Sequence, residues 1–240
     1  MMQETLLARI VAEGRAHCGS DSYFEERGFG EKLTGVLSLG ILPDGLRPFA
    51  EEIDEDPCVL ACYRYVIPEF RADGGISYLI VRIDASLARS KMPFRLRPVY
   101  KLGASKGALW HVCDLFRTDA PVVFICENWS DACSILEAGG AAVALNAIDH
   151  ILTLWKLLKR MPRITSRTYV LACDNDAYGV IGNENLQKMF DDLGLPARSF
   201  GPFPKGVKDC NAWLTTDRDA FVQHVHSFLT RGNPWYPLKN

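Results

Sequence analysis

The hydrophobic pattern of the chain changes its rhythm near residue 118. Up to that point, short helical and strand-like pieces alternate between turns rich in glycine and proline, and a helix is expected over residues 5–15. The apolar stretches 65–67 and 76–83 flank Asp73-Gly74-Gly75, a turn sequence that tolerates positive φ. The first part therefore predicts a β-hairpin over residues 63–82 inside a mixed α+β region.

After residue 118, short apolar runs alternate with helical segments. The expected strands are 122–126, 141–145, 169–173 and 197–200, and the expected helices are 130–138, 148–160 and 179–193. Buried strands that alternate with helices predict an α/β fold with a central parallel sheet. In such a sheet, ligands collect outside the carboxyl ends of the strands, so the functional site is expected there.

Charge is unevenly distributed in this chain of 240 residues with a formal net charge of −2. Near neutrality argues against a uniformly basic nucleic-acid binder, because affinity for a polyanion depends on clustered lysine and arginine. The stretch from residue 82 to residue 106 is nevertheless basic, and Asp84 is its single acidic residue. Its basic residues are Arg82, Arg89, Lys91, Arg95, Arg97, Lys101 and Lys106. Neither a long apolar run nor a secretion signal is present, so a cytoplasmic location is expected.

The eight cysteines are scattered, and several lie inside apolar runs, which predicts free buried thiols rather than disulfides. Cys58 and Cys62 have no second Cys or His pair at a spacing that completes a tetrahedral site, so no zinc is predicted. The histidines, among them His111, show no ligand spacing tied to the acidic residues.

Acidic side chains follow two of the predicted strands. Glu127 comes directly after the first, and Asp174 and Asp176 come directly after the third. Residues two apart in an extended segment project to the same side, so both aspartates can face one ion. Oxygen ligands of this kind suit Mg²⁺ or Mn²⁺. The alternative is that each acid caps the helix that follows it.

The segments around these acids resemble the TOPRIM signature of primases, topoisomerases and related nucleases. The matching residues are Glu127 with Asp131, then Gly139, then Asp174-Asn-Asp176 with Gly179. The resemblance implies that Glu127, Asp174 and Asp176 bind metal and support phosphoryl transfer, with Asp131 at an acidic position of the primase version. Asn128 stands where a glycine is usual, and asparagine is the nearest substitute for glycine at positive φ.

Residues 205–214 resemble the K-D-x-N segment of phage and plasmid primases. The resemblance implies a phosphate contact for Lys208 and a role at or beside the metal for Asp209. A plain turn in which Asn211 caps the helix containing Trp213 is the alternative.

The region before the acids is similar, in order and spacing, to the basic subdomain that precedes TOPRIM in bacterial-type primases. The resemblance implies three parts: a basic mixed α+β subdomain (1–118), a TOPRIM metal-binding domain (119–215), and a C-terminal helix and tail (216–240). Arg82, Lys101 and Lys106 are the expected phosphate contacts, followed by Arg64 and Arg97. A solvated basic face is the alternative.

The resemblance as a whole implies a DNA primase core, similar to primases of phages, plasmids and mobile elements, that makes RNA primers. Its expected partners are a single-stranded DNA template, nucleoside triphosphates and the RNA primer, with a replicative helicase or a separate zinc-binding domain. Two other functions stay open. The same carboxylates serve a TOPRIM-type nuclease, and a non-catalytic module of a replication protein would keep the fold and the metal without synthesis.

Overall fold

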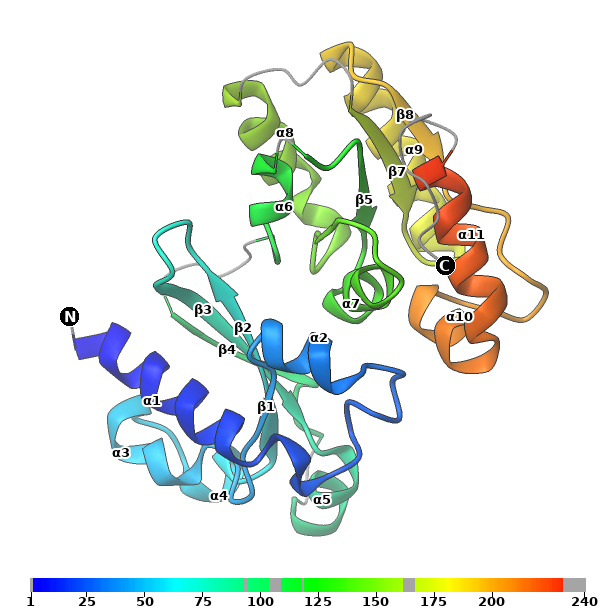
Figure 1. Cartoon of the computed structure of the whole chain (residues 1–240). Helices are drawn as coiled ribbons and strands as arrows, with labels where there is room; N and C mark the ends of the chain where they lie inside the picture. Colours follow the sequence, from blue (N-terminus) through cyan, green and yellow to red (C-terminus); the bar gives the residue numbers. More distant parts are fainter. Residues whose placement is uncertain (1, 93–94, 104–108, 118, 162–166, 231–240) are drawn as a thin grey trace. The chain divides into compact units, whose positions relative to one another are not determined.

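The computed structural model describes residues 2–92, 95–103, 109–117, 119–161 and 167–230, with side chains from residue 4 onward. The chain forms two compact units: Met1–Glu26 with Gly30–Lys106, and Arg27–Phe29 with Gly107–Asn240. Each unit has a sheet of its own (Figure 1). Each also has its own hydrophobic core. The boundaries at 118 and 215 delimit the functional parts that the resemblance implies, and they stay predictions.

The first unit contains an antiparallel sheet in the order β1-β2-β3-β4. Its strands are β1 (Gly40–Ile41), β2 (Tyr63–Phe70), β3 (Ile76–Ile83) and β4 (Val99–Gly103). Its helices are α1 (Met2–Ala16), α2 (Glu31–Val36), α3 (Ala50–Ile53), α4 (Pro57–Leu60) and α5 (Ala85–Lys91). The predicted opening helix and hairpin are confirmed.

The β2–β3 hairpin forms where the sequence predicted it, and its turn shows why. Gly74 adopts φ of 82°, a conformation that glycine reaches without a steric penalty. On one face of the sheet, apolar side chains of β3 such as Leu79 and Val81 share a core with Leu7 and Ile10 of α1. The amphipathic first helix is thus stabilised by covering one side of the sheet.

The second unit contains a parallel sheet in the order β6-β5-β7-β8. Its strands are β5 (Val122–Cys126), β6 (Ala142–Ala144), β7 (Thr168–Ala172) and β8 (Ala197–Ser199). Its helices are α6 (Cys113–Phe116), α7 (Trp129–Glu137), α8 (Ile151–Arg160), α9 (Ala177–Leu193), α10 (Cys210–Thr216) and α11 (Arg218–Thr230). The expected α/β fold with a central parallel sheet is confirmed.

Alternate residues of β5 face the two layers of helices. Ile125 belongs to a core that includes Leu154 of α8 and Phe190 of α9. On the opposite face, Phe124 packs edge-on against Phe200, and Phe228 of α11 packs against the same ring. Both faces of the strand are buried, which explains its uninterrupted apolar run.

A buried arginine fixes the segment that leads into β5. Arg167 has no exposed surface, and its guanidinium donates hydrogen bonds to the carbonyls of Leu115, Arg117 and Ala120. Cys126, Cys133 and Cys173 are buried free thiols, as the sequence predicted. Across the described ranges, the helices are too short or too polar to cross a membrane.

Candidate metal centre

The sheet brings Glu127 and Asp174 to the same edge. In the parallel pair of β5 and β7, Cys126 lies beside Ala172, so the residues that follow the two strands emerge together. The carboxylate of Glu127 accepts a hydrogen bond from the backbone N–H of Asp174. The predicted meeting of two carboxylates that are distant in the chain is therefore present.

Each of these carboxylates keeps one oxygen that the protein does not satisfy. Glu127 Oε2 and Asp174 Oδ1 are buried and have no hydrogen-bond partner among the described residues. Buried polar atoms are nearly always paired in native proteins, so two unpaired acceptors at one sheet edge point to a missing partner. A divalent cation with oxygen preference fits them.

The two carboxylate oxygens of Asp176 make different contacts. Oδ1 caps helix α9 by accepting hydrogen bonds from the N–H groups of Tyr178 and Gly179, both at 3.0 Å. Oδ2 lies 3.6 Å from Nζ of Lys208. The helix-capping alternative is thus correct for Asp176, and it leaves the second oxygen facing the acidic cluster.

Gly179 allows the helix to approach the strand end. A Cβ atom at this position would lie 1.9 Å from the carbonyl oxygen of Asp174, much closer than any real contact. The first turn of α9 therefore packs directly on the backbone that carries Asp174, and this close approach requires glycine.

Lys208 bridges the two aspartates. Its Nζ lies 3.2 Å from Asp174 Oδ2 and 3.6 Å from Asp176 Oδ2. The backbone carbonyl of Lys208 accepts a hydrogen bond from the N–H of Asn175, which joins the K-D-x-N segment to the segment between the aspartates. The resemblance implies a phosphate contact for Lys208, which stays a prediction; the structure places its ammonium group between the two aspartates.

Asp131 and Asp209 form a second layer of acids. Asp131 is only 1% exposed, and its Oδ1 accepts a hydrogen bond from the backbone N–H of Asn211. Asp209 caps α10 through the N–H of Ala212 at 2.7 Å. The alternative in which Asn211 caps this helix is wrong, since the Asn211 amide instead donates to Ser134 Oγ.

Burial and the charges of neighbouring groups shift the pKa values of the cluster. Burial, followed by the nearby charge of Asp174, raises the pKa of Glu127. Burial also raises the pKa of Asp174 in spite of its contact with Lys208, and it raises the pKa of Asp131 well above the usual range. The N–H groups at the start of α9, that of Gly179 first, lower the pKa of Asp176. A bound cation would offset the repulsion among these acids.

Asn128 does not use the conformation that its substitution for glycine suggested. Its φ is −121°, which is ordinary extended backbone at the position preceding α7. A positive φ is therefore not the reason for asparagine at this position. Its side chain instead forms a hydrogen bond with Asp131.

The carboxylates of Glu127, Asp174 and Asp176 do not form a closed cage. Among the described residues, three ligand atoms within 4.8 Å of one another occur at His111, Cys113 and Asp114 and not at these three acids. Mg²⁺ commonly keeps several waters and uses substrate phosphates as ligands, so an open arrangement suits it. The His111 group is not apparent in the sequence as a paired Cys or His motif, because it comes from a single His-x-Cys-Asp run.

Two of the predicted phosphate contacts share one face of the antiparallel sheet. Arg82 lies opposite Val99, and Lys101 lies opposite Ile80, so strand alternation directs both basic side chains to the same side. Arg82 Nε is buried without a hydrogen-bond partner in the described part of the chain. Burial lowers the pKa of Lys101.

The other predicted basic contacts differ in their surroundings. Arg64 is engaged by Asp84 at 3.0 Å, by Asp21 at 3.5 Å and by the carbonyl of Leu42. Arg97 is exposed, and its carbonyl accepts a hydrogen bond from the hydroxyl of Tyr63. Lys106 lies outside the described residues.

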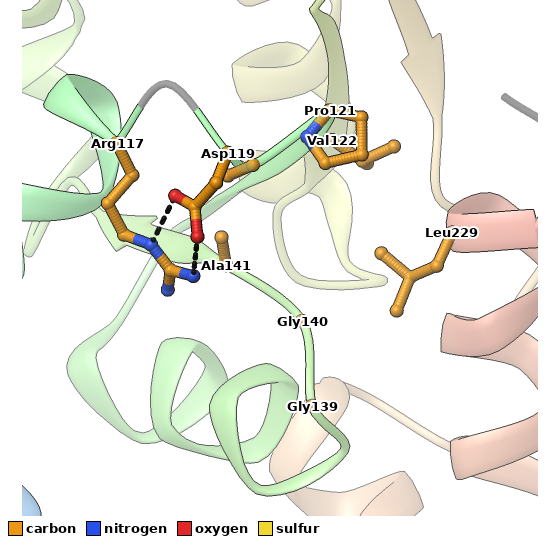
Figure 2. A pocket seen from close by; sticks show the side chains of 9 residues that line it. Arg117, Asp119, Pro121, Val122, Gly139, Gly140, Ala141 and Leu229 are labelled. Carbon is orange, nitrogen blue, oxygen red and sulfur yellow. Dashed lines mark hydrogen bonds and ion pairs between the residues drawn. The ribbon is translucent and has the colours of Figure 1, made fainter. Parts of the chain in front are cut away.

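A small cavity lies at the opposite edge of the parallel sheet, beside the first residues of β5 and β6 (Figure 2). It is lined by the Arg117–Asp119 ion pair, by Gly139 and Gly140, and by Leu229. Its volume of about 70 Å³ is well below that of an ordinary ligand pocket. The cavity is far too small for a nucleotide.

The fold that carries these acids is that of the catalytic core of bacterial-type DNA primases. Three solved structures document the likeness. The zinc-binding and RNA polymerase domains of the Aquifex aeolicus primase match with a TM-score of 0.67 and 14% identity, over 94% of this chain and 60% of that one. The RNA polymerase domain of the Mycobacterium tuberculosis primase DnaG matches with a TM-score of 0.64 and 16% identity, over 95% and 86%.

A DnaG primase catalytic domain bound to single-stranded DNA matches with a TM-score of 0.63 and 14% identity, over 94% of this chain and 81% of that one. No family model matches the chain, and no curated protein matches it in sequence. At these identities the likeness establishes the fold. This chain spans only 60% of the Aquifex chain.

Proposed function

We propose that this chain is the catalytic core of a DNA primase, a nucleotidyltransferase that makes short RNA primers from nucleoside triphosphates on single-stranded DNA. The observation that carries the proposal is the pair of buried, unsatisfied carboxylate oxygens of Glu127 and Asp174 at the carboxyl edge of the parallel sheet. The primase-core fold around them supports it.

Glu127, Asp174 and Asp176 are the proposed ligands of Mg²⁺ or Mn²⁺. When bound, such ions supply Lewis-acid stabilisation of the attacking 3′-oxygen and of the leaving pyrophosphate. Two of the three ligands are oriented by the backbone: Glu127 by the N–H of Asp174, and Asp176 by the N–H groups that begin α9. Asp131 and Asp209 are proposed to lie next to these ligands. Each accepts a hydrogen bond from a backbone N–H at the start of α10.

Basic side chains are proposed to position the phosphates. Lys208 stands at the acidic cluster with 59% of its side chain exposed, so its ammonium group is free to turn toward a triphosphate. In the first unit, Arg82 offers a buried guanidinium Nε without a partner among the described residues, and Lys101 points to the same face of its sheet. Arg97 and Lys106 are proposed as further contacts, whereas the two carboxylates beside Arg64 favour a structural role for it.

Partners follow from the same proposal. The Aquifex structure carries a zinc-binding domain as well as a polymerase domain, and one solved relative is the primase fragment of a phage T7 primase-helicase that matches with a TM-score of 0.55. We propose that a separate zinc-binding domain or a helicase selects the initiation site for this core.

A primer-synthesis assay tests the proposal. Wild-type protein with single-stranded DNA, nucleoside triphosphates and Mg²⁺ or Mn²⁺ is expected to give short RNA products. Asp174→Ala is expected to lower the yield at least about 100-fold, because it removes a metal ligand. Lys205→Ala, an exposed lysine in the same loop, is the control and should keep full activity.

Two results would reject the proposal. Equal product from the wild type and from Asp174→Ala would separate the activity from the acidic cluster. Metal-dependent nicking of DNA without added nucleotides, in the absence of any primer product, would instead establish the nuclease.

A further inference from the structure

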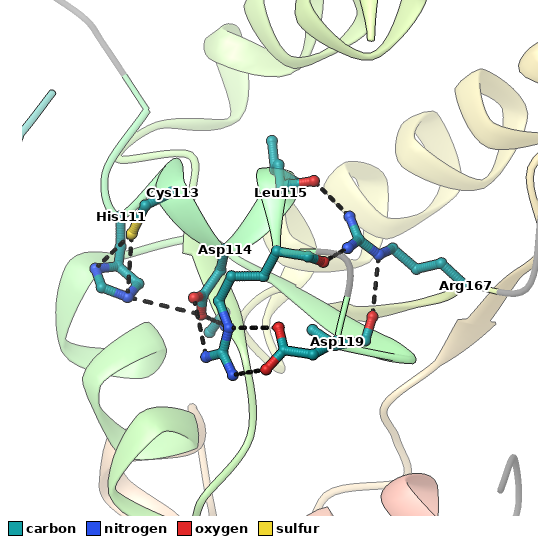
Figure 3. Close-up of polar contacts among 9 residues, drawn as sticks. His111, Cys113, Asp114, Leu115, Asp119 and Arg167 are labelled. Carbon is teal, nitrogen blue, oxygen red and sulfur yellow. Dashed lines mark hydrogen bonds and ion pairs between the residues drawn. The ribbon is translucent and has the colours of Figure 1, made fainter. Parts of the chain in front are cut away.

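Outside the acidic cluster, three side chains of different chemistry converge at the start of α6 (Figure 3). His111 Nε2 lies 3.6 Å from Cys113 Sγ and 3.6 Å from Asp114 Oδ2. One nitrogen, one sulfur and one oxygen lie within 4.8 Å of one another. The group uses none of the residues assigned to the candidate metal centre.

Two of the three distances between the ligand atoms fit a tetrahedral ion. Bonds of about 2.0–2.3 Å from a zinc-type ion to nitrogen, oxygen and sulfur place the ligands of a tetrahedral site about 3.3–3.6 Å apart. The two distances from His111 Nε2, 3.6 Å each, already agree with this geometry. Cys113 is exposed, so its side chain is able to rotate and close the remaining distance without moving the backbone.

The backbone behind the three side chains is fixed. Trp110 and Ala144 exchange two backbone hydrogen bonds, which anchors the segment to β6 just before His111. Asp114 Oδ2 accepts the N–H of Ala142 at 2.8 Å, and Arg167 holds the carbonyl of Leu115. A ligand carboxylate that is itself hydrogen-bonded is typical of metal sites, because the bond fixes its orientation.

A structural role for Asp114 is the competing explanation. Its Oδ1 lies 3.4 Å from Arg117 Nη1, and its Oδ2 accepts the N–H of Ala142, so the carboxylate already has a cation and a hydrogen-bond donor as partners. Arg117, however, contacts Oδ1 and not Oδ2. It also forms an ion pair with Asp119 at 3.1 Å. A carboxylate has about four lone-pair positions, so Oδ2 retains capacity for an ion.

We propose that His111, Cys113 and Asp114 bind one divalent ion of zinc type. Sulfur and nitrogen ligands select such an ion over Mg²⁺. Water fills the fourth position on the exposed side of Cys113. Binding requires the thiolate, so the thiol proton passes to the buffer as the sulfur–metal bond forms. The ion would fasten the start of α6 to β6, independently of whether the acidic cluster makes primers.

Cobalt substitution tests the proposal in the full chain. Metal-free protein in excess Mg²⁺, which occupies the carboxylate cluster, is titrated with Co²⁺ while the thiolate-to-cobalt charge-transfer band is recorded. The wild type should saturate this band at one equivalent, and Zn²⁺ should abolish it. Cys113→Ser should lack the band, His111→Gln should bind at least tenfold more weakly, and Cys58→Ser should behave as wild type.

A second measurement needs no variant. Zn²⁺ should slow alkylation of Cys113 by iodoacetamide at least tenfold, read by mass spectrometry of its peptide, while exposed Cys58 reacts at an unchanged rate. A wild type without the thiolate band, a band that persists in a folded Cys113→Ser, or equal alkylation of Cys113 with and without Zn²⁺ would overturn the proposal.

Discussion

Glu127 keeps a buried oxygen without a partner among the described residues, and such an atom costs stability. The charge of Asp174 adds to this cost, because the pKa of Glu127 is raised first by burial and then by that neighbour. A bound cation would offset both costs. A residue retained at a cost to the fold is typical of a functional site.

The first prediction concerns Glu127→Gln. In metal-free protein at neutral pH, the neutral amide should raise the melting temperature by about 2 °C, which corresponds to roughly 0.5–1 kcal/mol for a chain of this size. The stabilisation that Mn²⁺ gives the wild type should be lost. Thermal unfolding with and without Mn²⁺ measures both effects, and an unchanged response to Mn²⁺ would exclude Glu127 as a ligand.

The second prediction concerns Lys208. Its ammonium group lies where it competes with a cation for Asp174 and Asp176. Lys208→Ala should therefore bind Mn²⁺ about 1.4- to fivefold more tightly, the range expected from an exposed ion pair of roughly 0.2–1 kcal/mol. Primer synthesis should nevertheless fall at least tenfold through the loss of a phosphate contact. Weaker Mn²⁺ binding in isothermal titration would contradict the competition, and Lys205→Ala serves as the control.

The apolar pattern of the strands predicted most of the parallel sheet. The apolar run of β5 matched the predicted residues 122–126 because both faces of that strand are buried. Since parallel strands end at a common edge, the meeting of Glu127 with Asp174 was predictable as well. The conformation of Asn128 was not, because a single residue type does not determine φ. The grouping of His111 with Asp114 was also not predictable, because it depends on a turn at His111 with φ of 60°.

The contact between α9 and β7 gives the third prediction. Gly179→Ala should destabilise the protein by about 3 kcal/mol, at the upper end of the range for overpacking, because the added Cβ meets the carbonyl of Asp174. Mn²⁺ affinity should fall with it, since the strand end that carries the aspartates must shift.

Gly35→Ala is the matched control for this substitution. Gly35 lies in helix α2, and a Cβ there meets nothing within 4 Å, so denaturant unfolding should show no loss of stability. If Gly179→Ala were as stable as this control and bound Mn²⁺ normally, the close approach of α9 would not be needed.

For the whole molecule, the division of charge between the two units matters more than the total of −2. Arg82 and Lys101 belong to the first unit, and the acidic cluster belongs to the second. A nucleic acid held through phosphates releases counterions, so its affinity depends on salt in proportion to the contacts made.

The fourth prediction follows from this charge division. Arg82→Ala should weaken binding of single-stranded DNA and should lower the slope of log affinity against log salt by about 0.7, the value for one phosphate contact on a single strand. Arg89→Ala removes the same charge from an exposed position on α5 and should leave the slope unchanged. Fluorescence anisotropy at several salt concentrations measures both slopes. Equal losses would indicate a diffuse basic surface.

Arg167 has a consequence for how relatives of this chain should be sought. One planar guanidinium ties together the carbonyls of Leu115, Arg117 and Ala120, and a lysine has neither the fork nor the reach to replace it. Selection on this position comes from the backbone of the chain itself and not from any substrate. An arginine just before the third strand of the parallel sheet should therefore persist in descendants that have lost the catalytic acids, and it would mark their common ancestry after the chemistry has gone.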